Sequence, residues 1–570
     1  MEPRDDGVPS GGMSWVRGSR SQPLLEVTIP GLLAGCLAAR RDATAAVFPG
    51  EGIRWTWEEF ARRVDALAGG LARLGYATGD RLGIWAPNRS EWLLTQFATA
   101  RLGVILVTIN PAYRVHELEY ALKLSGCRGL VLAERFKGSD YAAMVASLVP
   151  ELGAAGAEIA AEALPALRHL IVMSAETRPG MLRFRDVEAM GAGAAASGLD
   201  AVSARLDRRD PINIQFTSGT TGRPKGATLT HRNIVNNAAF VTAALKLGPE
   251  DRLCIPVPFY HCFGMVMGTL GCVTKGATMI VPGEGFDPAV TLATVAAERA
   301  TGLYGVPTMF VAMLEHPDFD CHDLSSLRTG IMAGAPCPIE VMKRVQSQMH
   351  MREVTIAYGM TETSPVSFQS STDTPVEKRV TSVGRVHPHV EVRVADPEGN
   401  TVPVGEQGEI LTRGYSVMHG YWDDPAQTAA AIDAEGWMHT GDLGRIDAEG
   451  YCNITGRVKD MICRGGENVY PREIEEFLYS HPAVSQVQVF GIPDHALGEI
   501  VCAWIIARAG SAPTEDEIRA FCKGQIAHYK IPAVVRFRED LPVTVTGKPQ
   551  KFLMRAAMIE ELGLSEEKSA

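Results

Sequence analysis

Apolar residues recur along the N-terminal part of the chain in two alternating spacings. Residues 55–76 carry them at helical spacing, whereas 81–86 and 103–110 are short β-type runs bounded by glycine or proline. Similar β-type runs follow at 278–282, 301–310 and 328–338, with helical stretches between them. Strands that alternate with helices predict α/β layers with buried, largely parallel sheets. The alanine-rich stretch 154–167 is expected to form a surface helix.

The pattern changes after about Val380 to short strand-like segments, which predict a smaller β-rich subdomain. It changes again at Lys459-Asp460, after which the chain reads β-β-α-β, a compact α+β module. The predicted fold class is therefore α/β, with a large N-terminal domain of layered sheets and a small mobile α+β C-terminal domain. The expected bounds are 23–459 for the large domain, with its β-rich subdomain at about 380–459, and 460–570 for the small one.

The amino-acid composition and the net charge disfavour some classes of function. The 570 residues include 46% hydrophobic and 21% charged residues, which is ordinary for a globular protein of more than one domain. The net charge of -11 disfavours nucleic-acid binding, which needs a dense positive surface. The 11 cysteines form no CxxC pair and no Cys/His cluster at metal-ligand spacing. They are therefore expected to be reduced, which favours a cytoplasmic location.

The N-terminus carries no secretory signal, and the chain has no apolar run of spanning length, so no membrane-spanning segment is expected. Residues 1–22 are rich in glycine, serine, proline and charge, and we expect a disordered tail there. Arg17, Arg20 and the serines around them leave a mitochondrial transit peptide, and hence a matrix location, as the alternative.

The stretch "FTSGTTGRPKG" leads from a β-type run into hydroxyls, glycines and a lysine. Glycines let several N–H groups point inward, and Lys225 supplies a point charge, so the stretch predicts a phosphate-binding loop. The P-loop of nucleoside triphosphatases does not match, because only two residues separate Gly219 from Gly222 and Gly226 stands where a hydroxyl is needed. A mobile Ser/Gly surface loop without a ligand remains the other interpretation.

Six motifs occur in order: "TSGTTGRPKG", "GAP" at 334–336, "YGMTE" at 358–362, "HTGDLG" at 439–444, "GRVKD" at 456–460 and "TGK" at 546–548. In this order and over almost the whole chain, they resemble the adenylate-forming superfamily of acyl-CoA synthetases, luciferases and peptide-synthetase adenylation domains. The sequence between these motifs most resembles that of the medium-chain fatty acyl-CoA ligases of the acyl-CoA synthetase family member 2 type. Pro549 departs from this group, which usually has isoleucine after the lysine.

This resemblance implies a ligase that uses ATP, Mg²⁺ and coenzyme A to convert a carboxylic acid first to acyl-AMP and then to a thioester. In that scheme Thr361 binds the α-phosphate and Glu362 binds Mg²⁺. Tyr358 stacks on adenine, while Asp442 and Arg457 bind the ribose. The implied ATP- and AMP-binding residues are Thr217, Ser218, Gly219, Thr220, Thr221, Gly222, Arg223, Pro224, Lys225, Gly334, Ala335, Pro336, Tyr358, Gly359, Met360, Asp442 and Arg457.

The resemblance also makes Lys548 the catalytic cation, bridging the attacking carboxylate and the α-phosphate. Because Lys548 lies far along the chain from the phosphate loop, the C-terminal domain must close over the large one, with Lys459 and Asp460 as the hinge. In the second half-reaction the family rotates this domain. The residues then expected to line the coenzyme A tunnel are Gly465, Gly466 and Glu467.

His261, in "PFYHCFG", resembles the family's gating aromatic position and is a candidate catalytic residue, although a structural role is equally open. The same region lacks the aspartate with which amino-acid-activating domains bind an ammonium group, which disfavours an amino-acid substrate. Small and apolar residues suit an alkyl chain, and they are also ordinary core residues. The acyl-pocket candidates are His261, Gly264, Met265, Met267, Pro307, Thr308 and Met309.

Three functions stay open: a free-standing acyl-CoA ligase with small-molecule substrates, an adenylating enzyme that loads a carrier protein or activates an aromatic or other acid, and a protein that kept the fold without the chemistry. The motifs carry Thr361, Glu362, Asp442, Arg457 and Lys548 intact, which argues against the third.

Overall fold

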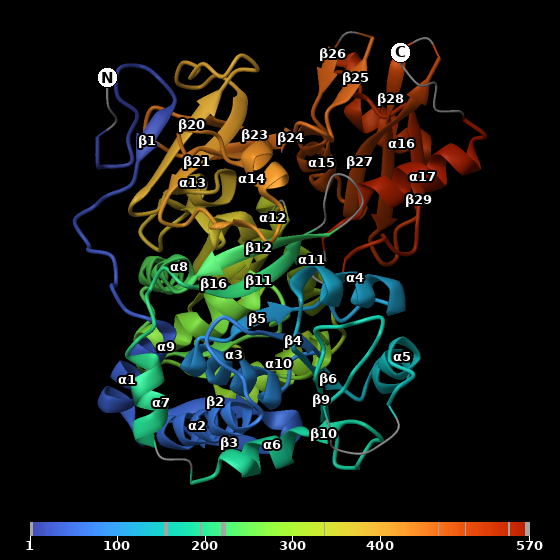
Figure 1. The fold of residues 1–570 in the computed structure, drawn as a ribbon. Coiled ribbons are helices and arrows are strands. Elements are labelled where there is room, and N and C mark those ends of the chain that lie inside the picture. The colour runs from blue at the N-terminus through green and yellow to red at the C-terminus, as the bar shows by residue number, and fades with distance from the viewer. Residues whose placement is uncertain are drawn as a thin grey trace.

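The structure is a computed structural model that describes residues 4–152, 158–193, 196–217, 224–335, 337–465, 467–495, 497–544 and 548–564. Figure 1 shows the layered N-terminal domain, the β-rich subdomain and the C-terminal module, which is coloured red. None of the helices in the described part of the chain has both the length and the apolar character that a membrane crossing needs.

Two large sheets form the N-terminal domain. The first has the order β10-β9-β6-β4-β5-β11-β12-β22 and is parallel from β10 to β11. Its strands are β10 (Leu182–Arg183), β9 (His169–Met173), β6 (Gly129–Ala133), β4 (Arg81–Trp85), β5 (Ile105–Thr108), β11 (Pro211–Thr217), β12 (Lys225–Thr230) and β22 (Gly420–Tyr421). The antiparallel hairpin β11–β12 is the part of this sheet that reaches the predicted phosphate loop.

The second sheet has the order β19-β18-β17-β16-β15-β13-β14-β2-β3 and is parallel from β17 to β2. Its strands are β19 (Arg385–Val386), β18 (Val366–Gln369), β17 (Glu353–Gly359), β16 (Thr329–Ala333), β15 (Gly302–Gly305), β13 (Arg252–Cys254), β14 (Thr278–Ile280), β2 (Thr44–Phe48) and β3 (Ile53–Thr56). The predicted α/β layering with buried parallel strands is confirmed, since β6, β9 and β16 are buried along their whole length.

Amphipathic helices pack with these sheets. Helix α2 (Trp57–Arg73) begins at a capping box in which Thr56 and Glu59 satisfy each other's backbone N–H groups. It packs against α1 (Ile29–Arg40), α3 (Ser90–Leu102) and α6 (Phe184–Gly191). The helix predicted from the spacing at 55–76 is therefore confirmed, and its apolar face lies in the core.

Two sequence expectations are wrong. Within 158–167, the described part of the alanine-rich stretch, the chain forms no helix. Ile159, Leu164 and Leu167 are buried there, and Pro165 offers no N–H for a helix. In addition, the described part of 1–22 is not a disordered tail, because β1 (Trp15–Arg17) pairs antiparallel with β20 (Val390–Ala395).

The N-terminal strand belongs to the β-rich subdomain, a sheet with the order β1-β20-β21-β23-β24. Its other strands are β21 (Gly408–Gly414), β23 (Met438–Ile446) and β24 (Cys452–Arg457). Trp15 packs edge-on against Trp437 with a 6.2 Å centroid separation. Arg17, which had suggested a transit peptide, donates to Glu391 at 2.9 Å and so contributes to this sheet.

Deletion of residues 1–22 is expected to lower the free energy of unfolding by about 2 kcal/mol or more, since β1 brings the fully buried Val16 to the sheet. A lower urea midpoint measures the loss. Deletion of residues 1–4, which leaves β1 in place, is the control. An unchanged midpoint after the longer deletion would show that β1 adds nothing to stability.

The C-terminal module has its own sheet, in which β27 (Val484–Asp494) pairs with β28 (Gly498–Ala507) and β28 with β29 (Val534–Phe537). A short hairpin, β25 (Ile462–Arg464) and β26 (Glu467–Val469), extends it. With α16 (Glu515–Cys522) the predicted β-β-α-β order is confirmed. Its core residues cluster separately from the main core, which ends along the chain at Cys452.

Candidate active site

The candidate site lies where the carboxyl ends of β16 and β17, the hairpin β11–β12 and the strands β23–β24 meet the C-terminal module. Parallel sheets bind ligands at this end of their strands. Helix α15 (Pro471–Tyr479) brings the module against β24, where Arg472 Nη1 donates to the carbonyl of Ile454 at 2.8 Å. Figure 1 shows the module beside the β-rich subdomain.

Glu362 is held in a short turn, Thr361–Thr363, directly after β17, and both Thr361 and Glu362 are buried. Its carboxylate Oε1 accepts two hydrogen bonds, from the hydroxyls of Thr217 and Tyr421, each at 3.0 Å. Burial and the neighbouring Glu362 raise the pKa of Tyr421, so its hydroxyl stays a donor. The arrangement fixes a charged carboxylate beside the strand that leads into the phosphate loop.

Asp442 is the centre of a second cluster. The hydroxyl of Tyr358 donates to Oδ2 at 2.7 Å, and Arg457 Nε donates to Oδ1 at 2.9 Å. Asp442 is buried, whereas the Arg457 side chain is 64% exposed. Asp442 raises the pKa of Arg457, and burial raises that of Tyr358. Both carboxylate oxygens keep lone pairs, so the cluster can accept a pair of sugar hydroxyls.

Gly334 follows β16 with φ +89, a conformation that favours glycine. A Cβ added at Gly334 would stand 3.2 Å from Val306 Cγ1 and 3.9 Å from Lys548 Cε. The exposed Gly334 and partly exposed Ala335 thus form a surface facing the lysine, and Pro336 lies outside the described residues. Gly359 ends β17, and Met360 leads from it into the turn of Glu362.

Lys548 belongs to the C-terminal module and pairs there with Thr544. Its N–H donates to Thr544 Oγ1 at 3.0 Å, and its carbonyl accepts from the Thr544 N–H at 2.8 Å. Burial lowers the pKa of the ammonium and Arg457 lowers it further, whereas Asp442 and Glu362 oppose this. The lysine therefore lies within electrostatic range of both carboxylates.

His261 lies close enough to Lys548 for the two side chains to interact electrostatically. Its Nδ1 accepts the N–H of Phe263 at 3.2 Å. Burial, with a smaller contribution from Lys548, lowers the pKa of His261 to about 3. The imidazole is therefore neutral at physiological pH, with its proton on Nε2, and it can donate a hydrogen bond but not act as a cation.

The described parts of the phosphate loop are its two ends, Thr217 and Pro224-Lys225, since Ser218, Gly219, Thr220, Thr221, Gly222 and Arg223 lie outside the described residues. Lys225 Nζ donates to Gln427 Oε1 at 2.6 Å and lies 4.9 Å from the ring centroid of Tyr421. The sequence reasoning missed Tyr421 and Gln427. The only available signal was an aromatic hydroxyl in "GYWDD", far along the chain from the loop.

Some of the acyl-pocket candidates have structural roles that account for their residue types. Gly264 lies in a π-helix, Phe263–Leu270, where a Cβ would stand 2.3 Å from the carbonyl oxygen of Pro258. Met265 is buried, with its Sδ 3.9 Å from Gln215 Nε2. Pro307, Thr308 and Met309 form the first turn of α11 (Pro307–Leu314), where proline is favoured. Cys262 donates to Gln215 at 3.1 Å behind His261 and was not predicted.

The structure does not bring the predicted coenzyme A residues to the site. Gly465, with φ +59, ends β25, and its N–H donates to the carbonyl of Leu497 at 2.7 Å. Glu467 begins β26 and is exposed, and Gly466 lies outside the described residues. Figure 1 shows the β25–β26 hairpin at the far end of the module from β11 and β12. Lys548 and the described residues of this hairpin, Gly465 and Glu467, therefore lie on different faces of the module.

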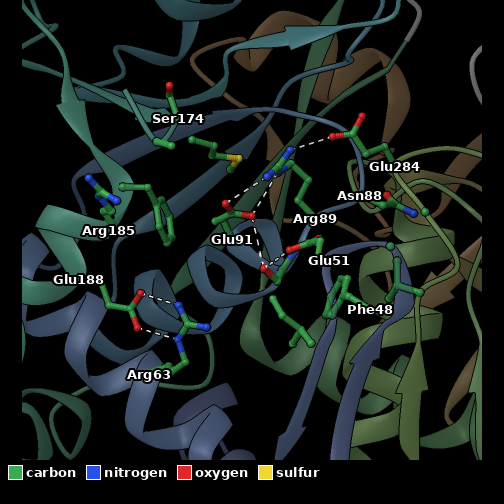
Figure 2. Close-up of a pocket in the computed structure, with 18 residues that line it drawn as sticks. Phe48, Glu51, Arg63, Asn88, Arg89, Glu91, Ser174, Arg185, Glu188 and Glu284 are labelled. Carbon is green, nitrogen blue, oxygen red and sulfur yellow. Dashed lines mark hydrogen bonds and ion pairs between the residues drawn. The ribbon is translucent and has the colours of Figure 1, made fainter. Parts of the chain in front are cut away.

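A cavity of 670 Å³ lies elsewhere, between β2, β9, α3 and α6, and none of the predicted site residues that the structure describes lines it (Figure 2). Its charged groups pair with one another. Arg63 makes two 2.7 Å bonds to Glu188, and Arg89 lies between Glu91 and Glu284. Because these cations are already neutralised, the cavity is poorly suited to a nucleotide triphosphate.

A carboxylate held by two hydroxyls, an aspartate paired with an arginine and a tyrosine, and a lysine from a separate module form the arrangement expected of an adenylate-forming enzyme. Comparison with known proteins agrees. Residues 35–422 match the AMP-binding enzyme family, and residues 473–548 match the AMP-binding enzyme C-terminal domain. The chain belongs to the AMP-binding enzyme family.

Individual relatives cover nearly the whole chain. YngI of Bacillus subtilis (strain 168), whose name assigns it provisionally to the acyl-CoA synthetases, is 49% identical over 95% of this chain and 99% of its own. The mitochondrial medium-chain acyl-CoA ligase ACSF2 of Danio rerio is 44% identical over 98% of this chain and 92% of its own. The crystal structure of the anthranilate CoA ligase AuaEII with anthranoyl-AMP superposes with a TM-score of 0.84 at 27% identity, covering 95% of this chain and 99% of that one. The predicted family and fold are confirmed.

Proposed function

We propose that the protein is an ATP-dependent, AMP-forming ligase that joins a medium-chain fatty acid to coenzyme A through an acyl-adenylate. The observation that carries the proposal is the position of Lys548. Lys548 of the small module lies against Gly334, where an added Cβ would stand 3.9 Å from its Cε, and the carboxylates of Asp442 and Glu362 oppose the lowering of its pKa. A cation held there can stabilise the negative charge that develops as a carboxylate attacks the α-phosphate of ATP.

In the first half-reaction this chain mainly positions its substrates. Asp442 and Arg457 hold the ribose, and Tyr358 presents its ring to adenine while its hydroxyl orients Asp442. Lys225 and the preceding loop hold the leaving pyrophosphate. Thr361 binds the α-phosphate. Lys548 bridges the two reacting groups and is withdrawn afterwards.

The residues present fit a bound Mg²⁺. Both hydroxyl donors use Glu362 Oε1, which leaves Oε2 for a cation among the described contacts. The described residues hold no group of three His, Cys, Asp or Glu side chains at metal-binding positions. A site with one carboxylate suits Mg²⁺, which is usually shared between a carboxylate and substrate phosphates. When bound, the ion would neutralise phosphate charge.

The second half-reaction needs the other face of the module. Strand β24 ends at Arg457 and β25 begins at Ile462, so Lys459 and Asp460 lie in the short connection between separately packed cores. Rotation about this connection withdraws Lys548 and presents Gly465, Gly466 and Glu467, where the absence of a side chain leaves room for the pantetheine arm of coenzyme A.

The identity of the carboxylic acid substrate is proposed from the relatives and from the residues of the π-helix and α11, which form the proposed acyl wall. The ACSF2 proteins are named for medium-chain acids, and the π-helix and α11 offer buried methionines that adapt to alkyl chains. An aromatic acid is the second candidate, because the anthranilate ligase shares the fold over nearly the whole chain. The cytoplasm is the proposed compartment, in keeping with 11 free cysteines, and the mitochondrial matrix is the alternative.

The test is coenzyme A-dependent AMP release over a panel of straight-chain acids from short to long, with benzoate and anthranilate as the aromatic arm. We expect AMP, pyrophosphate and acyl-CoA in equal amounts and the highest kcat/KM at medium chain length. Highest activity with an aromatic acid would favour the second candidate. Activity that requires a carrier protein in place of coenzyme A would overturn the ligase assignment.

A further inference from the structure

We propose that an ion pair between the buried Glu475 and Lys551 fixes the position of Lys548 in the active site. The proposal rests on the proposed function, because it gives these two residues a role in presenting the catalytic lysine. Neither residue touches the reacting atoms, so both are positioning residues.

Glu475 lies in the middle of α15 and is 4% exposed. Its Oε1 accepts the N–H of Val489 on β27 at 2.8 Å and the ammonium of Lys551 at 2.7 Å. A buried carboxylate is stable only with such partners, so the pair holds Lys551 at a defined point on the module. The Lys551 side chain is itself 20% exposed.

Lys551 is only three residues beyond Lys548, and the two residues between them are also restrained. Pro549 has a fixed φ and forms a β-bridge with Val543. The N–H of Gln550 donates to the carbonyl of Pro542 at 2.8 Å and closes the base of the segment. Because the residues between them are restrained, a displacement of Lys551 also displaces Lys548.

The same helix also contacts the large domain. Arg472, one turn before Glu475, donates to the carbonyl of Ile454 on β24, the strand that ends at Arg457. Helix α15 thus connects the strand carrying the proposed ribose ligand to the segment carrying the proposed catalytic lysine. Because α15 begins directly after the β25–β26 hairpin, the same helix supports the face that carries Lys548 and the face that carries the proposed coenzyme A residues.

Lys530 and Glu473 provide a matched control. Glu473 of α15 pairs with Lys530 of the short helix His528–Lys530 at an Nζ–Oε1 distance of 2.5 Å, but the Glu473 side chain is 51% exposed. This pair is remote in sequence from the segment of Lys548. Removing it changes the charge of the module in the same way without releasing the anchor.

The experiment measures acyl-AMP formation from ATP and acid, and separately thioester formation from supplied acyl-AMP and coenzyme A, in the full chain. Lys551→Met is expected to lower kcat of the first reaction about 10- to 100-fold, the effect of a misplacement near 1 Å, with the KM for ATP unchanged. Thioester formation should stay within about two-fold, since Lys548 is withdrawn in that step. Lys530→Met should leave both reactions near wild type.

Two further variants keep the test decisive if Lys551→Met folds poorly. Glu475→Gln retains an acceptor for Val489 but removes the charge, and it should show the same selective loss. Lys551→Arg keeps the cation and should restore the first reaction to within about three-fold of wild type. Equal losses in both half-reactions, or a loss no larger than that of Lys530→Met, would overturn the proposal. Failure of the proposed function itself would show separately, as a Lys548→Ala variant that still forms acyl-AMP.

Discussion

Replacing Lys548 with alanine should lower the rate of acyl-AMP formation by about 10²- to 10³-fold, the usual cost of removing one donor aimed at developing charge. The same variant should convert supplied acyl-AMP to acyl-CoA at nearly the wild-type rate. The asymmetry follows from the geometry. Lys548 lies against Gly334 and within electrostatic range of Asp442 and Glu362, whereas the proposed coenzyme A face of the module lies at its far end.

Single-turnover assays of the two half-reactions measure this effect. Lys523→Ala is the control, because it removes an exposed lysine of the same module that has no predicted part in the site. If both half-reactions fall together, the account in which one module serves two chemical steps by rotation is wrong.

Changing Glu362 to glutamine should reduce kcat/KM for ATP by about 10²-fold and raise the Mg²⁺ concentration needed for half-maximal activity. The amide oxygen of glutamine can still accept from Thr217 and Tyr421, so the local hydrogen bonds survive and only the charge is lost. A Mg²⁺ titration of adenylate formation at saturating ATP measures the shift.

The control for Glu362→Gln is Tyr421→Phe, which removes one hydroxyl donor and keeps the carboxylate. Its Mg²⁺ requirement should stay close to that of the wild-type protein. If the Mg²⁺ requirement of Glu362→Gln also matched the wild type, the carboxylate would have no role in binding the ion.

The sequence predicted those features of the fold that depend on residues close together along the chain. Short apolar runs bounded by glycine or proline predicted strands such as β4 and β14, and helical spacing predicted α2. Ordered motifs singled out Asp442, Arg457 and Lys548 as site candidates. Glycine was less informative. Gly334 has a positive φ at the site, while Gly264 avoids a clash with Pro258 and so reports packing as well as any acyl contact.

What the sequence could not predict depends on contacts between distant segments. Tyr421 reaches Glu362 only because β22 pairs with β12. The N-terminal segment looked disordered by composition, yet β1 gains stability from the edge of a sheet formed by residues nearly four hundred positions later. Likewise, nothing in the motif "TGKPQK" shows that its last lysine meets Glu475 on another helix.

The C-terminal module has a core of its own, and its described polar contacts with the large domain are few, such as Arg472 with Ile454 and Ser485 with Glu315. The module and the large domain consequently pack around separate cores. The wall formed by the π-helix and α11 can change shape without disturbing the element that supplies Lys548. Substitutions in the proposed acyl wall can therefore accumulate without loosening the separate core that supports the segment of Lys548.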